Sequence, residues 1–132
     1  MNHEIKIETT LTVTTDDIVC LLSCQGGGFD YWCQIEFDGD DYDTAKSNLK
    51  KENADATICY EDVLAEILEE GKTLYVNDFE DERFHDLTME KLLKGFELNA
   101  KNYPDDASME DGDADTADRI LQYAIFDDVI YA

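Results

Sequence analysis

The stretch from residue 104 to 118, PDDASMEDGDADTAD, contains seven acidic residues and no basic one. Closely spaced carboxylates could bind calcium, as in an EF-hand loop, which has acids at positions one, three and five, glycine at six and glutamate at twelve. A loop that starts at Asp111 places Thr116 at position six and Gln122 at position twelve, and one that starts at Asp38 also breaks the pattern. The sequence therefore predicts no EF-hand and leaves open only a weak, non-specific divalent site.

Thiol and imidazole groups are the other possible metal ligands. Cys20 and Cys24 are four residues apart in a predicted helix, Cys33 follows nine residues later, and the two histidines are His3 and His85. This spacing matches no closed zinc pattern. Because the start of the chain has no recognisable export signal, we expect reduced, mostly buried thiols rather than disulfides or a metal site.

The sequence offers little for catalysis. No serine occupies a nucleophile elbow, and the glycine-rich run GGGFD at residues 26–30 lacks the lysine of a phosphate-binding loop. Carboxylate pairs are so numerous that any one pairing can arise by chance. We therefore predict that the protein is not an enzyme and has no catalytic residue, no cofactor and no bound metal.

Charge is the dominant property of the chain. It has 33 acidic residues against 10 lysines and arginines, which gives a formal net charge of −23 over 132 residues. A small domain needs a net charge of only roughly 2–8 to stay soluble, and the excess repels itself. Direct binding to nucleic acid is excluded, because it requires clustered Lys and Arg. We expect a partner with a basic surface, with adaptation to a salty host as the alternative source of the charge.

Acids spaced along a folded surface can imitate the phosphates of a nucleic-acid backbone, because neighbours three or four residues apart on a helix lie about 5–6 Å from each other. Such a surface would compete for a basic groove, with fast and salt-sensitive association. A solvated acidic face with no such role is the alternative. The acids predicted to contact the partner are Glu36, Asp38, Asp40, Asp41, Asp43, Glu66, Glu69, Glu70, Asp78, Glu80, Asp81, Glu82, Asp105, Asp106, Glu110, Asp111 and Asp113.

Hydrophobic periodicity predicts the elements that position these acids. Strands are expected at residues 4–14, 29–37, 72–79 and 129–132, with 80–86 as a loop or a short hairpin arm. Helices are expected at residues 15–25, 58–71, 88–103 and 115–125, with 38–43 as a turn and 44–57 as a short helix plus loop. Thr14 or Thr15, Thr88 and Asp115 are the expected N-caps.

These elements predict a single α+β domain over residues 1–132, with about four mostly antiparallel strands and three or four helices packed on the sheet. No apolar run is long enough to cross a membrane. With no signal peptide recognised, we expect a cytoplasmic protein.

Three segments carry a resemblance to a known group: GGGFDYWCQIEF (26–37), LTMEKLLKGFEL (87–98) and DADTADRILQYAIFDDVIYA (113–132). In this order they resemble small acidic proteins encoded by phages, prophages and integrative elements of Gram-positive bacteria. Residues 38–60 fit that pattern poorly. The matching residues are Gly27, Gly28, Tyr31, Trp32, Cys33, Leu87, Thr88, Glu90, Lys91, Lys94, Gly95, Asp115, Ala117, Asp118, Gln122, Tyr123, Ala124 and Phe126.

The resemblance implies a mobile-element origin and a host bacterial cytoplasm, and it carries over no catalytic residue. Small acidic proteins of mobile elements often inhibit host defences, and by class the comparison is with acidic anti-CRISPR and anti-restriction proteins. We therefore expect a non-enzymatic inhibitor of a host defence nuclease, with a basic nucleic-acid-binding protein such as a CRISPR effector as its partner. The alternatives are an acidic structural or regulatory phage protein, or a small-ligand or metal-binding module that sequesters a defence signal, its pocket lined by residues 26–28 and 31–33.

Overall fold

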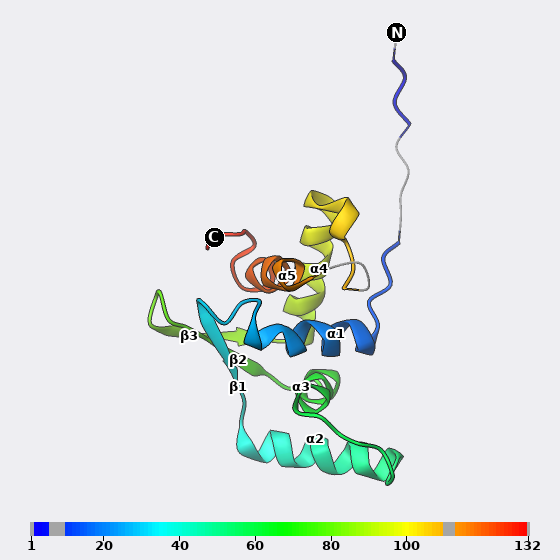
Figure 1. Ribbon diagram of the computed structural model, residues 1–132, viewed down its shortest axis with the longest axis vertical. Coiled ribbons are helices and arrows are strands. Elements are labelled where there is room, and N and C mark those ends of the chain that lie inside the picture. The colour runs from blue at the N-terminus through cyan, green and yellow to red at the C-terminus, as the bar shows by residue number, and fades with distance from the viewer. Residues whose placement is uncertain (1, 6–9, 110–112, 132) are drawn as a thin grey trace.

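The computed structural model describes residues 2–5, 10–109 and 113–131, and Figure 1 shows their arrangement. These residues form five α-helices, three strands and two short 3-10 helices, η1 and η2. The elements are α1 (Thr15–Leu22), η1 (Ser23–Gly26), β1 (Cys33–Glu36), α2 (Gly39–Glu52), α3 (Tyr60–Glu69), β2 (Leu74–Asp78), β3 (Arg83–Leu87), α4 (Met89–Asn102), η2 (Pro104–Asp106) and α5 (Ala114–Phe126).

The three strands form one antiparallel sheet in the order β1-β2-β3. Cys33 pairs with Asp78 between β1 and β2, and Val76 pairs with His85 between β2 and β3. Figure 1 shows the sheet at the left of the molecule, with α1, α3, α4 and α5 to its right. Helix α3 packs on β2, α5 packs on β3, and α1 contacts both helices. The sheet and helices thus enclose one core.

Short polar side chains start the helices. Thr14 caps α1 in a capping box with Asp17, and Thr88 caps α4 by accepting a hydrogen bond from the Lys91 amide. Asp38 caps α2 by accepting hydrogen bonds from the first two amides after Gly39. The predicted turn at residues 38–43 is therefore wrong, because Asp38 is the N-cap and residues 39–43 begin a 14-residue helix.

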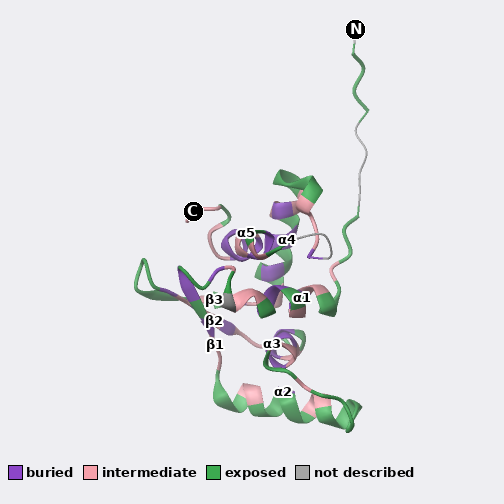
Figure 2. Ribbon diagram, in the orientation of Figure 1, coloured by how far each residue is buried: buried purple, intermediate pink, exposed green. Residues whose placement is uncertain are grey.

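The core is built around three large aromatic side chains, Phe29, Trp32 and Phe96, all fully buried. Helices α4 and α5 cross at Gly95, where an added Cβ would lie 3.0 Å from the Cβ of Ala124 and would overlap the Ile120 carbonyl. Glycine is required here because the two backbones approach too closely for any side chain. Figure 2 shows the buried residues concentrated in the sheet, α1, α3, α4 and α5, whereas α2 is mostly exposed.

The predicted strand at residues 4–14 is wrong wherever it can be checked. Residues 2–5 and 10–14 form no strand, and Ile5 is 84% exposed; residues 6–9 lie outside the described residues. The predicted strand at residues 129–132 is also wrong over 129–131. There the side chain of Gln122 holds the chain, with its Oε1 accepting hydrogen bonds from the amides of Ile130 and Tyr131.

The α+β class is confirmed, but the predicted number of strands and helices is not. The described residues contain three strands and five α-helices. The possible hairpin arm at residues 80–86 is indeed a strand, β3, paired with β2. The strand expected at residues 29–37 is shorter, because residues 29–32 form turns that bury Phe29 and Trp32.

Candidate functional site

The turn between β2 and β3 carries the first group of predicted acids, the hairpin acids Glu80, Asp81 and Glu82. All three are exposed, and Glu82 takes a positive φ of 51° at the tip. The one cation in this turn, Arg83, lies 3.7 Å from Asp81, and both side chains are more than half exposed. An exposed pair of this kind neutralises little of the local charge.

Asp78 does not belong to this acidic surface, contrary to the sequence prediction. It shares the inward face of β2 with Leu74 and Val76, and its exposed fraction is 0%. Its carboxylate accepts hydrogen bonds from the amides of Glu80 at 3.0 Å and Asp81 at 3.2 Å. Asp78 therefore shapes the hairpin from inside the core.

Asp78, Asp81 and His85 come close enough for their ligand atoms to surround one cation. However, the Tyr131 hydroxyl donates to Asp78 at 2.9 Å, and His85 Nε2 lies 3.4 Å from the same carboxylate. Burial, followed by this hydrogen bond, raises the pKa of Tyr131 to about 12, so the phenol keeps its proton. A buried carboxylate that is already surrounded by donors is a structural group rather than a free metal ligand.

The second group of acids lies where β1 leads into α2. Asp38, Asp40 and Asp43 are exposed, and Asp41 and Glu36 are half-buried. Asp40 and Asp41 occupy the first turn of α2, where the helix dipole favours negative charge. Lys72 lies 3.7 Å from Asp41 and 3.6 Å from Glu70. One lysine thus serves two carboxylates and leaves the others of this group without an ion pair among the described residues.

The third group consists of Glu66 and Glu69 on α3 and of Glu70, the C-cap residue of this helix. Glu69 accepts a hydrogen bond from the Thr15 hydroxyl at 3.0 Å, which ties α3 to α1. Glu66 is half-buried in a hollow of about 290 Å³ between α1, α2 and α3. Other acids that line this hollow, and that sequence reasoning missed, are Asp16, Glu52 and Asp62. Burial and then repulsion from Glu70 and Glu52 raise the pKa of Glu66.

Replacing Glu66 with glutamine should raise the free energy of unfolding at neutral pH by about 0.2–0.5 kcal/mol, the cost of one like-charge pair four residues apart. A raised pKa means that folded protein binds the proton more tightly, so ionised Glu66 opposes folding above that pKa. The gain should disappear below the ordinary glutamate pKa, about pH 4.3. Urea unfolding across this pH range measures it. If Glu69→Gln raised the free energy of unfolding equally, the effect would be due to net charge alone.

The fourth group surrounds η2 and the start of α5. Asp106 pairs with Arg119 at 3.2 Å, and the Arg119 guanidinium lies over the Tyr103 ring. Asp113 is the N-cap of α5, so the prediction of Asp115 as N-cap is wrong. The amides of Thr116 and Asp115 lower the pKa of Asp113. Asp105 is exposed, and Glu110 and Asp111 lie outside the described residues.

Several residues of the segments 26–37, 87–98 and 113–132 serve the interior. Asp118 accepts hydrogen bonds from Trp32 Nε1 at 2.8 Å, from the Tyr31 hydroxyl at 2.6 Å and from Gln122 Nε2 at 3.0 Å. Trp32 fills the core instead of lining the ligand pocket suggested above, and Gly28 is pressed against the Cys24 backbone. Trp32, Gly28 and Asp118 therefore contribute to packing.

The cysteines are all free, and they differ in exposure. Cys33 is buried and Cys24 is half-buried, whereas Cys20 and Cys59 are exposed. The expectation of mostly buried thiols is therefore wrong for two of the four.

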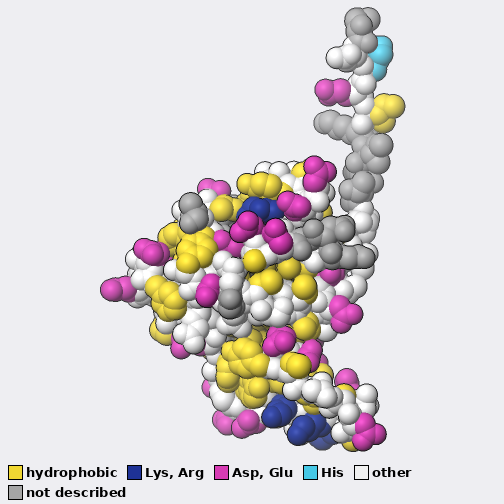
Figure 3. Space-filling model, viewed as in Figure 1, with side chains coloured by type: hydrophobic (Ala, Val, Ile, Leu, Met, Phe, Trp, Pro, Cys, Tyr) yellow, Lys and Arg dark blue, Asp and Glu magenta, His cyan; other side chains and the backbone are white. Residues whose placement is uncertain are grey.

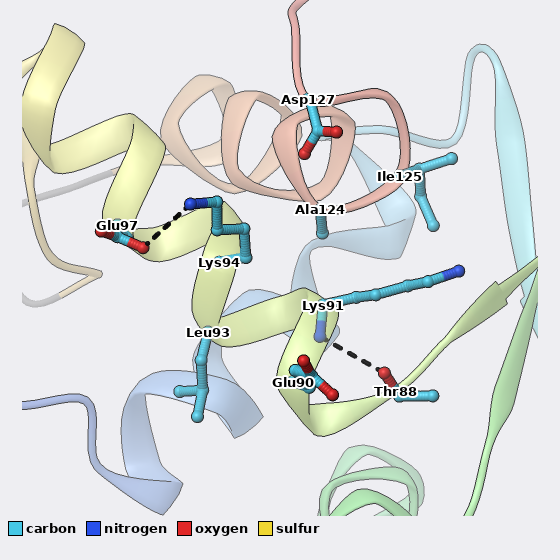
Figure 4. Close-up of a pocket in the computed structure, with 9 residues that line it drawn as sticks. All are labelled: Thr88, Glu90, Lys91, Leu93, Lys94, Glu97, Ala124, Ile125 and Asp127. Carbon is cyan, nitrogen blue, oxygen red and sulfur yellow. Dashed lines mark hydrogen bonds and ion pairs between the residues drawn. The ribbon is translucent and has the colours of Figure 1, made fainter.

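A cleft of about 890 Å³ separates α4 from the end of α5, as Figure 4 shows. Lys94 lies 3.4 Å from Glu97, and Lys91 donates to the backbone carbonyl of Asp86. Its described lining includes no cysteine, histidine or serine. Charges of both signs line it, unlike the acidic groups.

Basic side chains gather in few places. Three of them, Lys46, Lys50 and Lys51, follow one side of α2. Figure 3 shows acidic side chains over the whole visible face, whereas Lys and Arg gather at two places, one of them over α2. The predicted acids thus form several groups on different elements rather than one continuous stripe.

No family model, curated protein or solved structure matches this chain. Among the described residues, no helix combines the length and apolar character that a membrane span requires.

Proposed function

We propose that this protein is a non-enzymatic, phage-encoded inhibitor of a host defence nuclease, an anti-CRISPR protein first and an anti-restriction protein second. Its carboxylates would take the place of phosphates in the basic groove that holds DNA or guide RNA. The partner is then a basic nucleic-acid-binding protein in the host cytoplasm, and the protein itself binds neither nucleic acid nor membrane.

The observation that carries this proposal is the number of surface carboxylates without a compensating cation. Apart from buried Asp78, every described acid of the predicted set is exposed or half-exposed. Within the part of the chain that the structure describes, ion pairs reach four of them: Asp41, Glu70, Asp81 and Asp106. The self-repulsion of the remaining charge would be relieved in a basic groove.

Co-purification with a panel of purified CRISPR effectors and restriction enzymes tests for such a partner. We expect retention at low salt by a nuclease with an exposed basic groove. If every nuclease on the panel flows through at low salt, the inhibitor proposal fails for these classes.

Reversing the hairpin acids to lysine (Glu80→Lys, Asp81→Lys and Glu82→Lys) should weaken binding to that nuclease roughly 100-fold, because attraction to the basic groove would become repulsion. Each tenfold loss of affinity corresponds to about 1.4 kcal/mol. Asp78 must be left unchanged, since its loss would disturb the core instead of the surface. Titration calorimetry at fixed ionic strength measures the dissociation constant.

A control with the same change in net charge separates position from charge. Asp55→Lys, Glu90→Lys and Asp128→Lys alter three exposed acids outside the predicted set. This control should weaken binding far less than the hairpin variant. Equal losses would argue for a diffuse charge effect, and unchanged binding by the hairpin variant would favour the alternative of a solvated acidic surface.

A further inference from the structure

One face of the sheet carries no fully buried side chain. Residues of β1, β2 and β3 alternate between the core and this second face, and the strand pairing places two cross-strand rows on it. The six residues of this open sheet face are Gln34, Asn77 and Phe84 in one row and Glu36, Tyr75 and Asp86 in the other. Gln34, Phe84 and Asp86 are exposed, and the remaining three are half-buried.

The open sheet face combines aromatic rings with carboxylates. Phe84 is 60% exposed, a large value for a phenylalanine on a strand. Glu36 and Asp86 flank Tyr75 in the second row. None of the six residues is basic, and Arg83, the only lysine or arginine in the three described strands, has the inward register opposite Asp78.

Glu36 also has an unmet hydrogen-bonding capacity. Its Oε2 atom is buried and has no hydrogen-bond partner among the described residues. A buried carboxylate oxygen without a donor is unfavourable, and rotation of the Glu36 side chain toward an incoming N–H group would remove that cost. Beside β1 the surface sinks into a hollow of about 330 Å³, whose lining includes Gln34, Asp30 and the half-exposed Phe79. The open sheet face thus offers carboxylate acceptors and aromatic rings, and the hollow adjoins it at Gln34.

We propose that the open sheet face binds an arginine-bearing segment of the target protein. A guanidinium can stack on the Phe84 or Tyr75 ring and donate paired hydrogen bonds to Glu36 or Asp86. Lysine fits less well, because its ammonium is strongly hydrated and lacks the planar fork. Nucleic acid is not a suitable occupant, because its phosphates would meet these carboxylates. The inference rests on the proposed function, in that the partner is a basic protein, and adds the docking face and the side chain recognised.

Nuclear magnetic resonance with two peptides, hepta-arginine and hepta-lysine, tests this inference without any nuclease. With ¹⁵N-labelled protein, hepta-arginine should shift the amides of the open sheet face most, and hepta-lysine should bind more weakly. Phe84→Ala should reduce hepta-arginine affinity about fivefold, and Phe84→Tyr should retain it. Glu36→Gln should also weaken binding. The matched control is Leu93→Ala, which shortens an apolar side chain on α4 that is 42% exposed and should leave affinity unchanged.

Shifts spread evenly over all acidic groups, or equal affinity of Phe84→Ala and wild type, would overturn the inference. So would equal affinity for the two peptides. If wild type and Phe84→Ala bound a nuclease with equal affinity, the open sheet face would not be the docking face, but the proposed function would still hold. Selective hepta-arginine binding at this face supports the inference even if no nuclease is retained, a result that would contradict only the proposed function.

Discussion

Replacing Asp118 with alanine should lower the free energy of unfolding by about 3 kcal/mol, because hydrogen bonds to charged groups contribute about 1.5–3 kcal/mol and an unpaired buried donor adds a penalty. Asp118 accepts from Trp32 Nε1 at 2.8 Å, and Trp32 is fully buried. Alanine would leave this indole N–H without a partner and would release Tyr31 and Gln122 from the same carboxylate. Urea unfolding followed by the fluorescence of the single tryptophan measures the loss.

Asp115→Ala is the matched control for this experiment. Asp115 is also on α5, but it is exposed in the first turn, where a negative charge contributes only about 0.3–1 kcal/mol through the helix dipole. If the two variants lost equal stability, Asp118 would not be the acceptor that joins α5 to the turn before β1.

Gly95→Ala should destabilise the protein by about 2–3 kcal/mol, the usual cost of forcing an extra methyl group into a packed core. The new Cβ would overlap the Ile120 carbonyl and lie 3.0 Å from the Ala124 amide nitrogen, so the backbones of α4 and α5 would have to move apart. Alanine is intrinsically the better helix former, so any loss reports on this crossing. Thermal and urea unfolding give the change.

Gly39→Ala serves as the control, because no loss of stability is expected from it. Gly39 begins α2, and an added Cβ there would meet no atom within 4 Å. This variant should be neutral or slightly stabilising. A Gly95→Ala variant as stable as Gly39→Ala would mean that α4 and α5 are not in close contact at Gly95.

The elements with strong local signals were predicted well from sequence. Helix α3 follows from the spacing of Val63, Leu64, Ile67 and Leu68, which are all buried. The N-caps Thr14 and Thr88 have the expected hydrogen bonds. Such signals suffice because capping and helical amphipathicity depend on residues a few positions apart.

The secondary-structure predictions failed where tertiary contacts determine the structure of a segment. Alternation at residues 4–14 is typical of a strand, but a strand also needs a neighbour to pair with, and sequence alternation cannot supply one. Helix α2 was expected only as a short helix within residues 44–57, and its start at Gly39 was missed, because the segment is mostly polar and buries only Ala45 completely. Its cap, Asp38, was visible in the sequence but was interpreted as part of a turn.

The sequence names the acids of the candidate site but does not show how the structure places them. Asp78 could have been recognised as buried, because it has the same strand parity as Leu74 and Val76. Asp106 and Asp113 turned out to have local partners, in Arg119 and in the first amides of α5. The role of Asp118 depends on contacts with residues more than 80 positions away, which no local pattern predicts.

Competition between this protein and DNA for one nuclease tests the central claim most directly. The measurement is the dissociation constant for the guide-loaded or free nuclease across a salt series, with and without a DNA duplex that occupies the groove. The claim predicts mutually exclusive binding, and an affinity that falls steeply as salt rises. A ternary complex with DNA still in the groove, or an affinity independent of salt, would contradict it.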